Sequence, residues 1–142
     1  MRKEYKLNYN DDVRDNFIIR NIKIYSDDID NGNRFNTEFE VDVFSYDYSG
    51  KSLFIVDWHE LCSFATSLYE MNNNLKGTVC IKDLSLGSNV TFSINKFGRI
   101  NITGTIFSNH KEQSLKFNLN LDQTYMKRFS HDLYSDLVLE PT

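Results

Sequence analysis

The apolar and polar positions near the end of the chain follow two different periods. They alternate over residues 100–106 and again over residues 115–121, and a period of two residues predicts half-buried strands. After Asp122 the apolar residues recur at every fourth position, at Tyr125, Phe129, Leu133 and Leu137. This spacing predicts an amphipathic helix near 122–138, with Asp122 or Thr124 as its N-cap.

A second helical pattern occupies residues 57–74. Asp57 can accept hydrogen bonds from the free amides of a first helical turn, and Glu60 follows it as in a capping box. Apolar residues then recur at three- and four-residue spacing: Trp58, Leu61, Phe64, Ala65, Leu68 and Met71. The pattern predicts a helix that covers a sheet with one apolar stripe and ends near Asn72–Asn74 and Gly77.

The rest of the chain consists of short alternating runs. Strands are predicted around residues 5–9, 17–25, 35–43, 53–56, 79–81 and 90–94. Because apolar residues occupy both phases of the 17–25 run, that strand is predicted to be covered on both sides or to carry a bulge. Turns are predicted at 27–33, where Asn31-Gly32 suits a positive φ, and at 48–51.

Together these elements predict the α+β fold class, in a single domain of residues 1–142. About seven or eight strands joined mostly by tight turns favour an antiparallel sheet, bent or sandwich-like, with two covering helices near 57–74 and 122–138. A hydrophobic content of 40%, with 14% aromatic residues, supports a core that needs no disulfide or metal. Cys62 and Cys80 are therefore predicted to be buried thiols.

The charge balance narrows the class of partner. Lys and Arg number 16 and Asp and Glu number 20, so the formal net charge is −4. Proteins that bind nucleic acids typically carry a basic stripe that neutralises phosphates, so no nucleic-acid partner is predicted. The first residues lack the apolar core of a signal peptide, and the apolar run Leu53–Val56 is too short to span a bilayer. A cytoplasmic protein without a membrane partner is expected.

No grouping of residues in the sequence indicates catalysis. His59, His110 and His131 lack the spacing of zinc ligands and are predicted to be surface residues. The sequence contains neither a Gly-x-Ser-x-Gly nucleophile motif nor a glycine-rich phosphate loop. The prediction is therefore that the chain has no catalytic, cofactor-binding or metal-binding residues and uses no cofactor.

Acidic residues on one predicted strand are the strongest candidates for a binding surface. Glu38, Glu40 and Asp42 occupy alternate positions, which places them on one outward face at spacings of about 7 Å. Three interpretations stay open: a solvated face, a docking surface for a basic partner, and a pair of catalytic carboxylates. The neighbouring turn adds a second acidic group, Asp27, Asp28 and Asp30.

The order of these elements resembles that of a known family. The run Asp57-Trp58-His59-Glu60-Leu61, the turn glycines Gly77 and Gly98, and Asp122-Gln123-Thr124-Tyr125 after the last strand resemble the WapI-type immunity proteins of bacterial polymorphic-toxin systems. The resemblance covers roughly residues 35–137. It implies a small cytosolic protein that binds the toxic domain of a large secreted protein and blocks it, and it supplies no catalytic residues.

Because toxin domains of such systems are often nucleases with basic grooves, the resemblance gives the acidic residues a possible partner. Partner binding is accordingly predicted for Glu38, Glu40, Asp42, Asp27, Asp28 and Asp30. Two other classes stay open: a structural or assembly module, such as a homo-oligomer joined at a sheet edge, and an enzyme that uses the acidic strand. The residues alone leave the oligomeric state and the identity of the toxin open.

Overall fold

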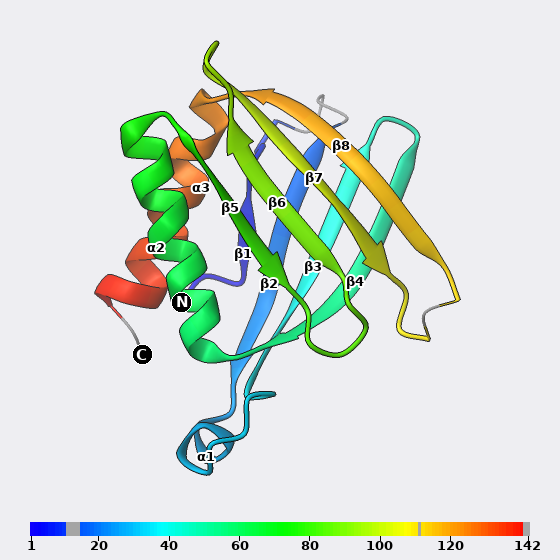
Figure 1. Ribbon diagram of the computed structural model, residues 1–142, viewed down its shortest axis with the longest axis vertical. Helices are drawn as coiled ribbons and strands as arrows, with labels where there is room; N and C mark the ends of the chain where they lie inside the picture. Colours follow the sequence, from blue (N-terminus) through cyan, green and yellow to red (C-terminus); the bar gives the residue numbers. More distant parts are fainter. Residues whose placement is uncertain (11–14, 111, 141–142) are drawn as a thin grey trace.

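The computed structural model describes residues 1–10, 15–110 and 112–140. In these residues eight strands form two four-stranded antiparallel sheets, each a meander in chain order (Figure 1). Sheet 1 contains β1 (Glu4–Lys6), β2 (Asn16–Ile24), β3 (Thr37–Ser45) and β4 (Tyr48–Val56). Sheet 2 contains β5 (Gly77–Lys82), β6 (Asn89–Ile94), β7 (Arg99–Phe107) and β8 (Ser114–Asp122). The predicted α+β class with a sandwich-like antiparallel architecture is confirmed.

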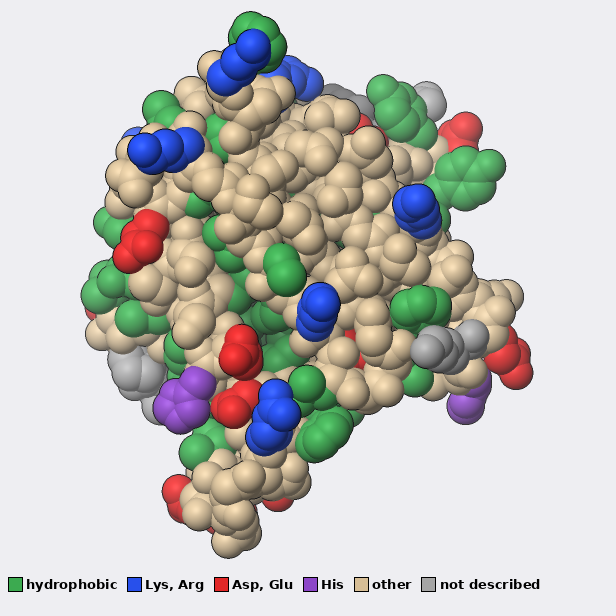
Figure 2. Space-filling view, viewed as in Figure 1, with side chains coloured by type: hydrophobic (Ala, Val, Ile, Leu, Met, Phe, Trp, Pro, Cys, Tyr) green, Lys and Arg blue, Asp and Glu red, His purple; other side chains and the backbone are tan. Residues whose placement is uncertain are grey.

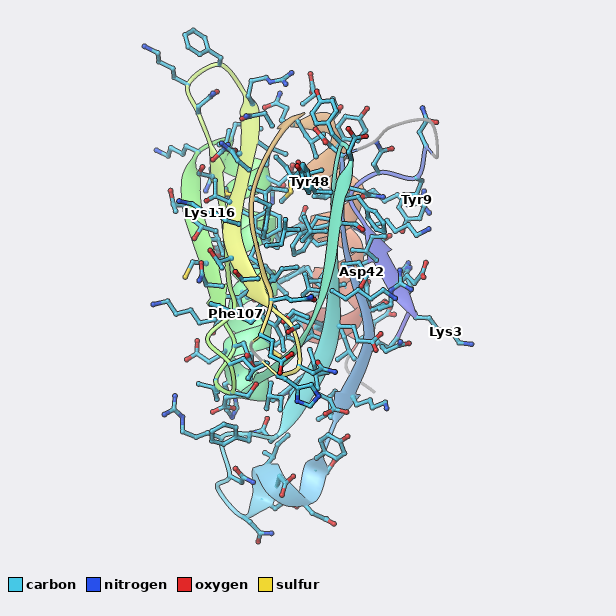
Figure 3. The ribbon with its side chains drawn as sticks, turned by 90° about the vertical axis from the view of Figure 1, so that its right-hand side faces the viewer. Lys3, Tyr9, Asp42, Tyr48, Phe107 and Lys116 are labelled. Carbon is cyan, nitrogen blue, oxygen red and sulfur yellow. The ribbon has the colours of Figure 1, made fainter. Side chains whose placement is uncertain are left out.

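The two predicted helices close one side of the sandwich. They are α2 (Trp58–Asn74) and α3 (Thr124–Tyr134), and α3 continues as a π-helical turn over Ser135–Leu139. Figure 1 shows both helices together beside β5, with a one-turn helix, α1 (Ser26–Asp30), projecting from the far end of sheet 1. Turned by 90°, the molecule shows the two sheets as separate layers, and the edge strands β4 and β8 lie on the side that faces the viewer (Figure 3).

The core joins both sheets and both long helices through aromatic rings. The Phe92 ring of β6 lies edge-on to Phe17 of β2, with ring centroids 5.2 Å apart, and stacks on Phe129 of α3 at 6.0 Å. Phe64 of α2 contacts the same Phe92 ring at 5.7 Å. Aromatic pairs of this kind stabilise a core by about 0.5–1.5 kcal/mol each beyond their buried area. The Phe92 ring of sheet 2 therefore links that sheet to sheet 1 and to both long helices.

Side chains cap both long helices near the predicted positions. Asp57 accepts from the His59 amide at 3.1 Å at the start of α2, and Asp122 accepts from the Thr124 amide at 3.0 Å at the start of α3. The α2 start has a further partner that the local sequence did not indicate. Asn36, just before β3, accepts from the Trp58 amide at 2.7 Å and so ties the helix to sheet 1.

The predicted turn at 48–51 is wrong. The chain reverses at Tyr46 and Asp47, where Tyr46 has a φ of 55°, and β4 already begins at Tyr48. Gly50, which belongs to the predicted turn, lies within β4 on the inner face. A Cβ atom there would lie 3.1 Å from both Ile106 Cδ1 and Leu115 Cδ2, so the glycine allows the two sheets to approach closely.

Other local predictions have mixed outcomes. The bulge in the 17–25 run is confirmed, because the β2–β3 register shifts between Arg20 and Lys23. The 27–33 segment forms α1 before a turn in which Gly32 has the predicted positive φ. The burial predicted for Cys80 is wrong: its side chain is exposed, since it points to the outer face of the edge strand β5.

Candidate protein-binding surface

The predicted acidic strand lies on the outer face of sheet 1. Glu38, Glu40 and Asp42 alternate along β3 with Phe39 and Val41, which are fully buried between the sheets. Alternation along a strand sends neighbouring side chains to opposite faces. The three carboxylates therefore share one face, as predicted, but their surroundings differ.

Asp42 is buried, so its predicted exposure is wrong. The residue is only 2% exposed, and its carboxylate forms an ion pair with Arg20 Nη2 at 2.8 Å. On the central strand β3 it has Ile18 and Lys51 as cross-strand neighbours, and these side chains with Arg20 cover it. Burial raises the pKa of the Asp42 carboxyl, an effect that the charges of Arg20 and Lys51 oppose. The Asp42–Arg20 contact is therefore a structural ion pair within sheet 1.

Glu38 and Glu40 remain within reach of solvent. Glu38 accepts from the Tyr25 hydroxyl at 2.8 Å and lies 4.0 Å from Lys23 Nζ. Glu40 accepts from Asn21 Nδ2 at 2.8 Å. Both acids, with Leu53, line an open hollow of about 320 Å³ on this face.

The acids of α1 extend this group beyond the sheet. Asp27 and Asp30 are exposed, and Asp28 is partly exposed, on the helix that projects from the molecule (Figure 1). Tyr25 immediately precedes α1 and bonds to Glu38 of β3. This hydrogen bond, with smaller contributions from desolvation and from the charges of Glu38 and Asp28, raises the pKa of the Tyr25 hydroxyl. The structure thus brings five of the six predicted residues to one end of the molecule. We call this group the acidic end: Asp27, Asp28, Asp30, Glu38 and Glu40.

An exposed aromatic group lies at the β3–β4 hairpin, just before and at the start of the predicted 48–51 turn. Phe44, Tyr46 and Tyr48 are 38%, 71% and 72% exposed. Tyrosine is enriched among the residues that dominate binding energy at protein interfaces, which makes exposed aromatic side chains candidate contacts. The alternation of these three aromatic residues was the available signal, and the misplaced turn concealed it.

The outer face of sheet 2 has a different chemistry. Figure 2 shows this face with scattered charged side chains among mostly uncharged ones. Threonine, serine and asparagine alternate outward along β6, β7 and β8, and Asn101 donates to Asn118 at 2.6 Å and to Asn120 at 3.0 Å. The polar groups of this face partly satisfy one another.

Within residues 1–10, 15–110 and 112–140, no three His, Cys, Asp or Glu side chains gather closely enough to bind a metal ion. His59, His110 and His131 are exposed, as predicted, on α2, in the β7–β8 loop and on α3. Of the helices in the described part of the chain, none has the length and apolar character that crossing a membrane requires.

Comparisons with known proteins bear on both fold and family. The sequence profile described as "Immunity protein WapI-like family" matches residues 8–141. A comparison with curated proteins finds no match. A solved chain described as "Crystal structures of trypanosoma bruciei MRP1/MRP2" is similar, with a TM-score of 0.53 and 7% identity, over 95% of this chain and 85% of that one. At that identity the likeness concerns the fold alone.

Proposed function

The chain belongs to the WapI-like immunity protein family, and we propose that it is a cytoplasmic immunity protein that neutralises a cognate toxin domain by direct, non-catalytic binding. The observation that carries this proposal is the family match over residues 8–141. The described surface supports it, since it offers charged and aromatic groups suited to a protein partner. Glu38 and Glu40, two of the strand carboxylates, accept hydrogen bonds from Tyr25 and Asn21.

In this proposal the acidic end meets a basic surface of the toxin. In the described part of the chain, no Lys or Arg nitrogen lies within 4.0 Å of a carboxylate of Asp27, Asp28 or Asp30. Their charges are therefore available to a partner. Complementary charge accelerates association and disfavours wrong partners, while a few pairs desolvated in the complex add affinity.

Asp42 takes an indirect role in this proposal. Its carboxylate is covered and already paired with Arg20, so a partner would have to displace that ion pair in order to reach it. We expect Asp42 to hold the partly exposed Arg20 in place and to affect binding only through the stability of sheet 1. The direct contacts are proposed for the acidic end.

A growth-rescue assay tests the proposed function. The toxin domain encoded immediately upstream of this gene is expressed with and without this protein, and complex formation is measured by calorimetry on the purified pair. Rescue together with a stable complex is the expected result. A toxin that remains lethal and shows no complex would overturn the function, and a stable oligomer of the protein alone would favour an assembly module.

Charge reversal tests the acidic end separately. The variant carries Asp27→Lys and Asp30→Lys, and the matched control carries Glu70→Lys and Glu140→Lys at exposed positions elsewhere. Both variants change the net charge equally, so any difference reports position. We expect affinity to fall by about tenfold or more for the acidic-end variant, since like charges at an interface are repulsive. Equal affinities of the two variants would exclude the acidic end as the contact.

A further inference from the structure

One edge of sheet 1 has backbone groups that point to solvent in a known register. At the end of β4, the Ile55 amide donates to Asp83 Oδ1 at 2.8 Å, and its carbonyl accepts from the Leu84 amide at 2.8 Å. These groups therefore point away from β3. In an antiparallel strand the backbone amide and carbonyl groups of every second residue point to the same side. The amides and carbonyls of Ser49, Lys51 and Leu53 therefore point the same way as those of Ile55.

The free part of this edge has defined limits. Within the described residues, the backbone groups of Ser49, Lys51 and Leu53 have no hydrogen-bond partner at the edge. The β5–β6 loop closes the edge at Ile55 through Asp83 and Leu84. Five residues of β4, from Ser49 to Leu53, are thus open to pairing with another strand.

A groove follows the same five residues. One hollow of about 390 Å³ lies between Tyr48–Lys51 and the residues at the β7–β8 connection, including Leu115. A second, of about 330 Å³, continues along Lys51–Leu53 and shares Lys51 and Ser108 with the first. The second hollow also shares Glu40 and Leu53 with the hollow at the acidic end. Figure 3 looks onto this side of the molecule, with Tyr48 at the start of β4.

The groove contains an acid, Glu40, and a base, Lys51, and neither has an ion-pair partner within 4.0 Å among the described residues. Of the carboxylates on the outer face of sheet 1, Glu4, Glu38 and Asp42 each have a Lys or Arg nitrogen within 4.0 Å. For Glu40, the described residues supply only the Asn21 amide. Glu40 pairs across the ladder with Leu53. A residue added opposite Leu53 would lie on the same face about 10 Å from Glu40, within the combined reach of a glutamate and a long basic side chain.

We propose that the β4 edge from Ser49 to Leu53 is the docking site for an extended segment of the toxin domain, which adds a fifth strand to sheet 1 and places a Lys or Arg against Glu40. This inference rests on the proposed function and adds a second contact surface, next to the acidic end. Edge pairing of this kind supplies affinity through main-chain hydrogen bonds and specificity through alternate side chains. The exposed Tyr46 and Tyr48 flank the segment at one end, and the acidic end flanks it at the other.

A second copy of the chain fits this edge less well. Symmetric antiparallel pairing of two β4 edges about the centre of the free segment would place Lys51 directly opposite Lys51 of the other copy. Like charges directly opposite one another destabilise a cross-strand pair, and an exposed edge lysine is a common device against self-pairing. The lysine therefore favours a different chain as the occupant.

Amide hydrogen exchange tests the pairing directly on the unmodified protein. Exchange is followed by NMR for the protein alone and in complex with the purified upstream toxin domain. The amides of Ser49, Lys51 and Leu53 are expected to slow by about tenfold or more on binding, while the Ile55 amide, already bonded to Asp83, changes little. Unchanged exchange at the three amides within a stable complex would overturn the proposal, as would their protection in the protein alone at high concentration.

Paired substitutions separate the amide from the side chain. Lys51→Pro removes the outward N–H without breaking a β3–β4 hydrogen bond, whereas Lys51→Ala removes the lysine side chain and keeps that N–H. The matched control is Lys116→Pro against Lys116→Ala on β8. The Ser108 amide donates to Gln113 O, so alternation directs the Lys116 N–H outward as well.

Affinity for the toxin domain is the readout for these variants. Lys51→Pro is expected to bind about tenfold more weakly than Lys51→Ala, because a carbonyl of the partner loses its donor, while the two Lys116 variants bind alike. Glu40→Gln should weaken binding more than Glu4→Gln. Wild-type rescue with no difference within the Lys51 pair would overturn edge docking and leave the proposed function intact. If the wild-type protein neither binds the toxin domain nor rescues growth, both edge docking and the proposed function are overturned.

Discussion

The outer faces of the two sheets occupy equivalent places in the sandwich, yet they differ in how their polar groups are satisfied. On sheet 1, carboxylates alternate with cations in neighbouring strands, as in the Arg20–Asp42 pair and the Arg20–Glu4 pair. On sheet 2, amides satisfy one another, as in the bonds from Asn101 to Asn118 and Asn120. The charges on sheet 1 can attract a charged partner electrostatically over a distance, whereas the neutral amides on sheet 2 interact with a partner only on direct contact. This contrast directs attention to sheet 1 for recognition.

The contrast also applies to stability. A buried charge depends strongly on its partner, because removing that partner leaves an uncompensated charge in a poorly solvated site. A hydrogen bond between neutral amides near solvent is worth much less, since water replaces it when one partner is lost. The two faces should therefore respond unequally to single substitutions.

Arg20→Ala should produce the largest effect. It removes the cation that lies 2.8 Å from the buried Asp42 carboxylate. We expect the free energy of unfolding to fall by about 3 kcal/mol. This value is near the lower end of the range for removing one partner of a buried ion pair, because Arg20 itself is partly exposed. Urea unfolding monitored by circular dichroism measures the change. Arg99→Ala on the exposed face of sheet 2 is the control, and similar losses in both variants would remove the distinction between the faces.

Asn101→Ala should have a smaller effect. The substitution removes the amide that joins β7 to Asn118 and Asn120 on sheet 2. We expect a loss of about 1 kcal/mol that does not change with salt concentration, because no charge is involved. Unfolding at low and high salt tests this, with Asn118→Ala as a second removal from the same network. A strong salt dependence would show that electrostatics also dominates sheet 2.

The pH dependence contributed by Asp42 should be the smallest effect. Burial raises the pKa of this carboxyl in the folded protein, with Arg20 and Lys51 opposing the rise. Between the ordinary pKa of an unfolded Asp, about 3.9, and the raised folded value, the folded state retains the proton longer. Stability from this group therefore falls as the pH rises through that window.

Comparison with Asp42→Asn isolates this contribution from that of other carboxyls. The free energy of unfolding of the wild type minus that of the variant should decrease as the pH rises from about 4, because only the wild type acquires the buried charge. Thermal unfolding of both proteins without denaturant, over a series of pH values, measures this difference in the free energy of unfolding. A difference that grows with pH would mean that the Arg20 pair outweighs burial and that the folded pKa is lowered.

Much of the architecture was predictable because it depends on neighbours in the sequence. The strands β5 to β8 and both long helices follow from alternating or four-residue spacing of apolar residues, which is a property of each segment by itself. The caps at Asp57 and Asp122 are equally local, since each carboxylate binds an amide two residues further on. The gathering of charge at Asp27, Asp28 and Asp30 was also visible before the fold was known.

What the tertiary structure decided depends on which strands lie side by side. Asp42 is buried because Arg20 and Lys51 flank it from β2 and β4, whereas Glu40, two residues earlier, remains exposed. Gly50 belongs to a strand because Leu115 of the other sheet occupies the space of its missing side chain. The open β4 edge exists because a loop covers Ile55 but stops there. The sequence determined the elements through local periodicity, and packing between distant segments determined which of their polar groups are available to bind a partner.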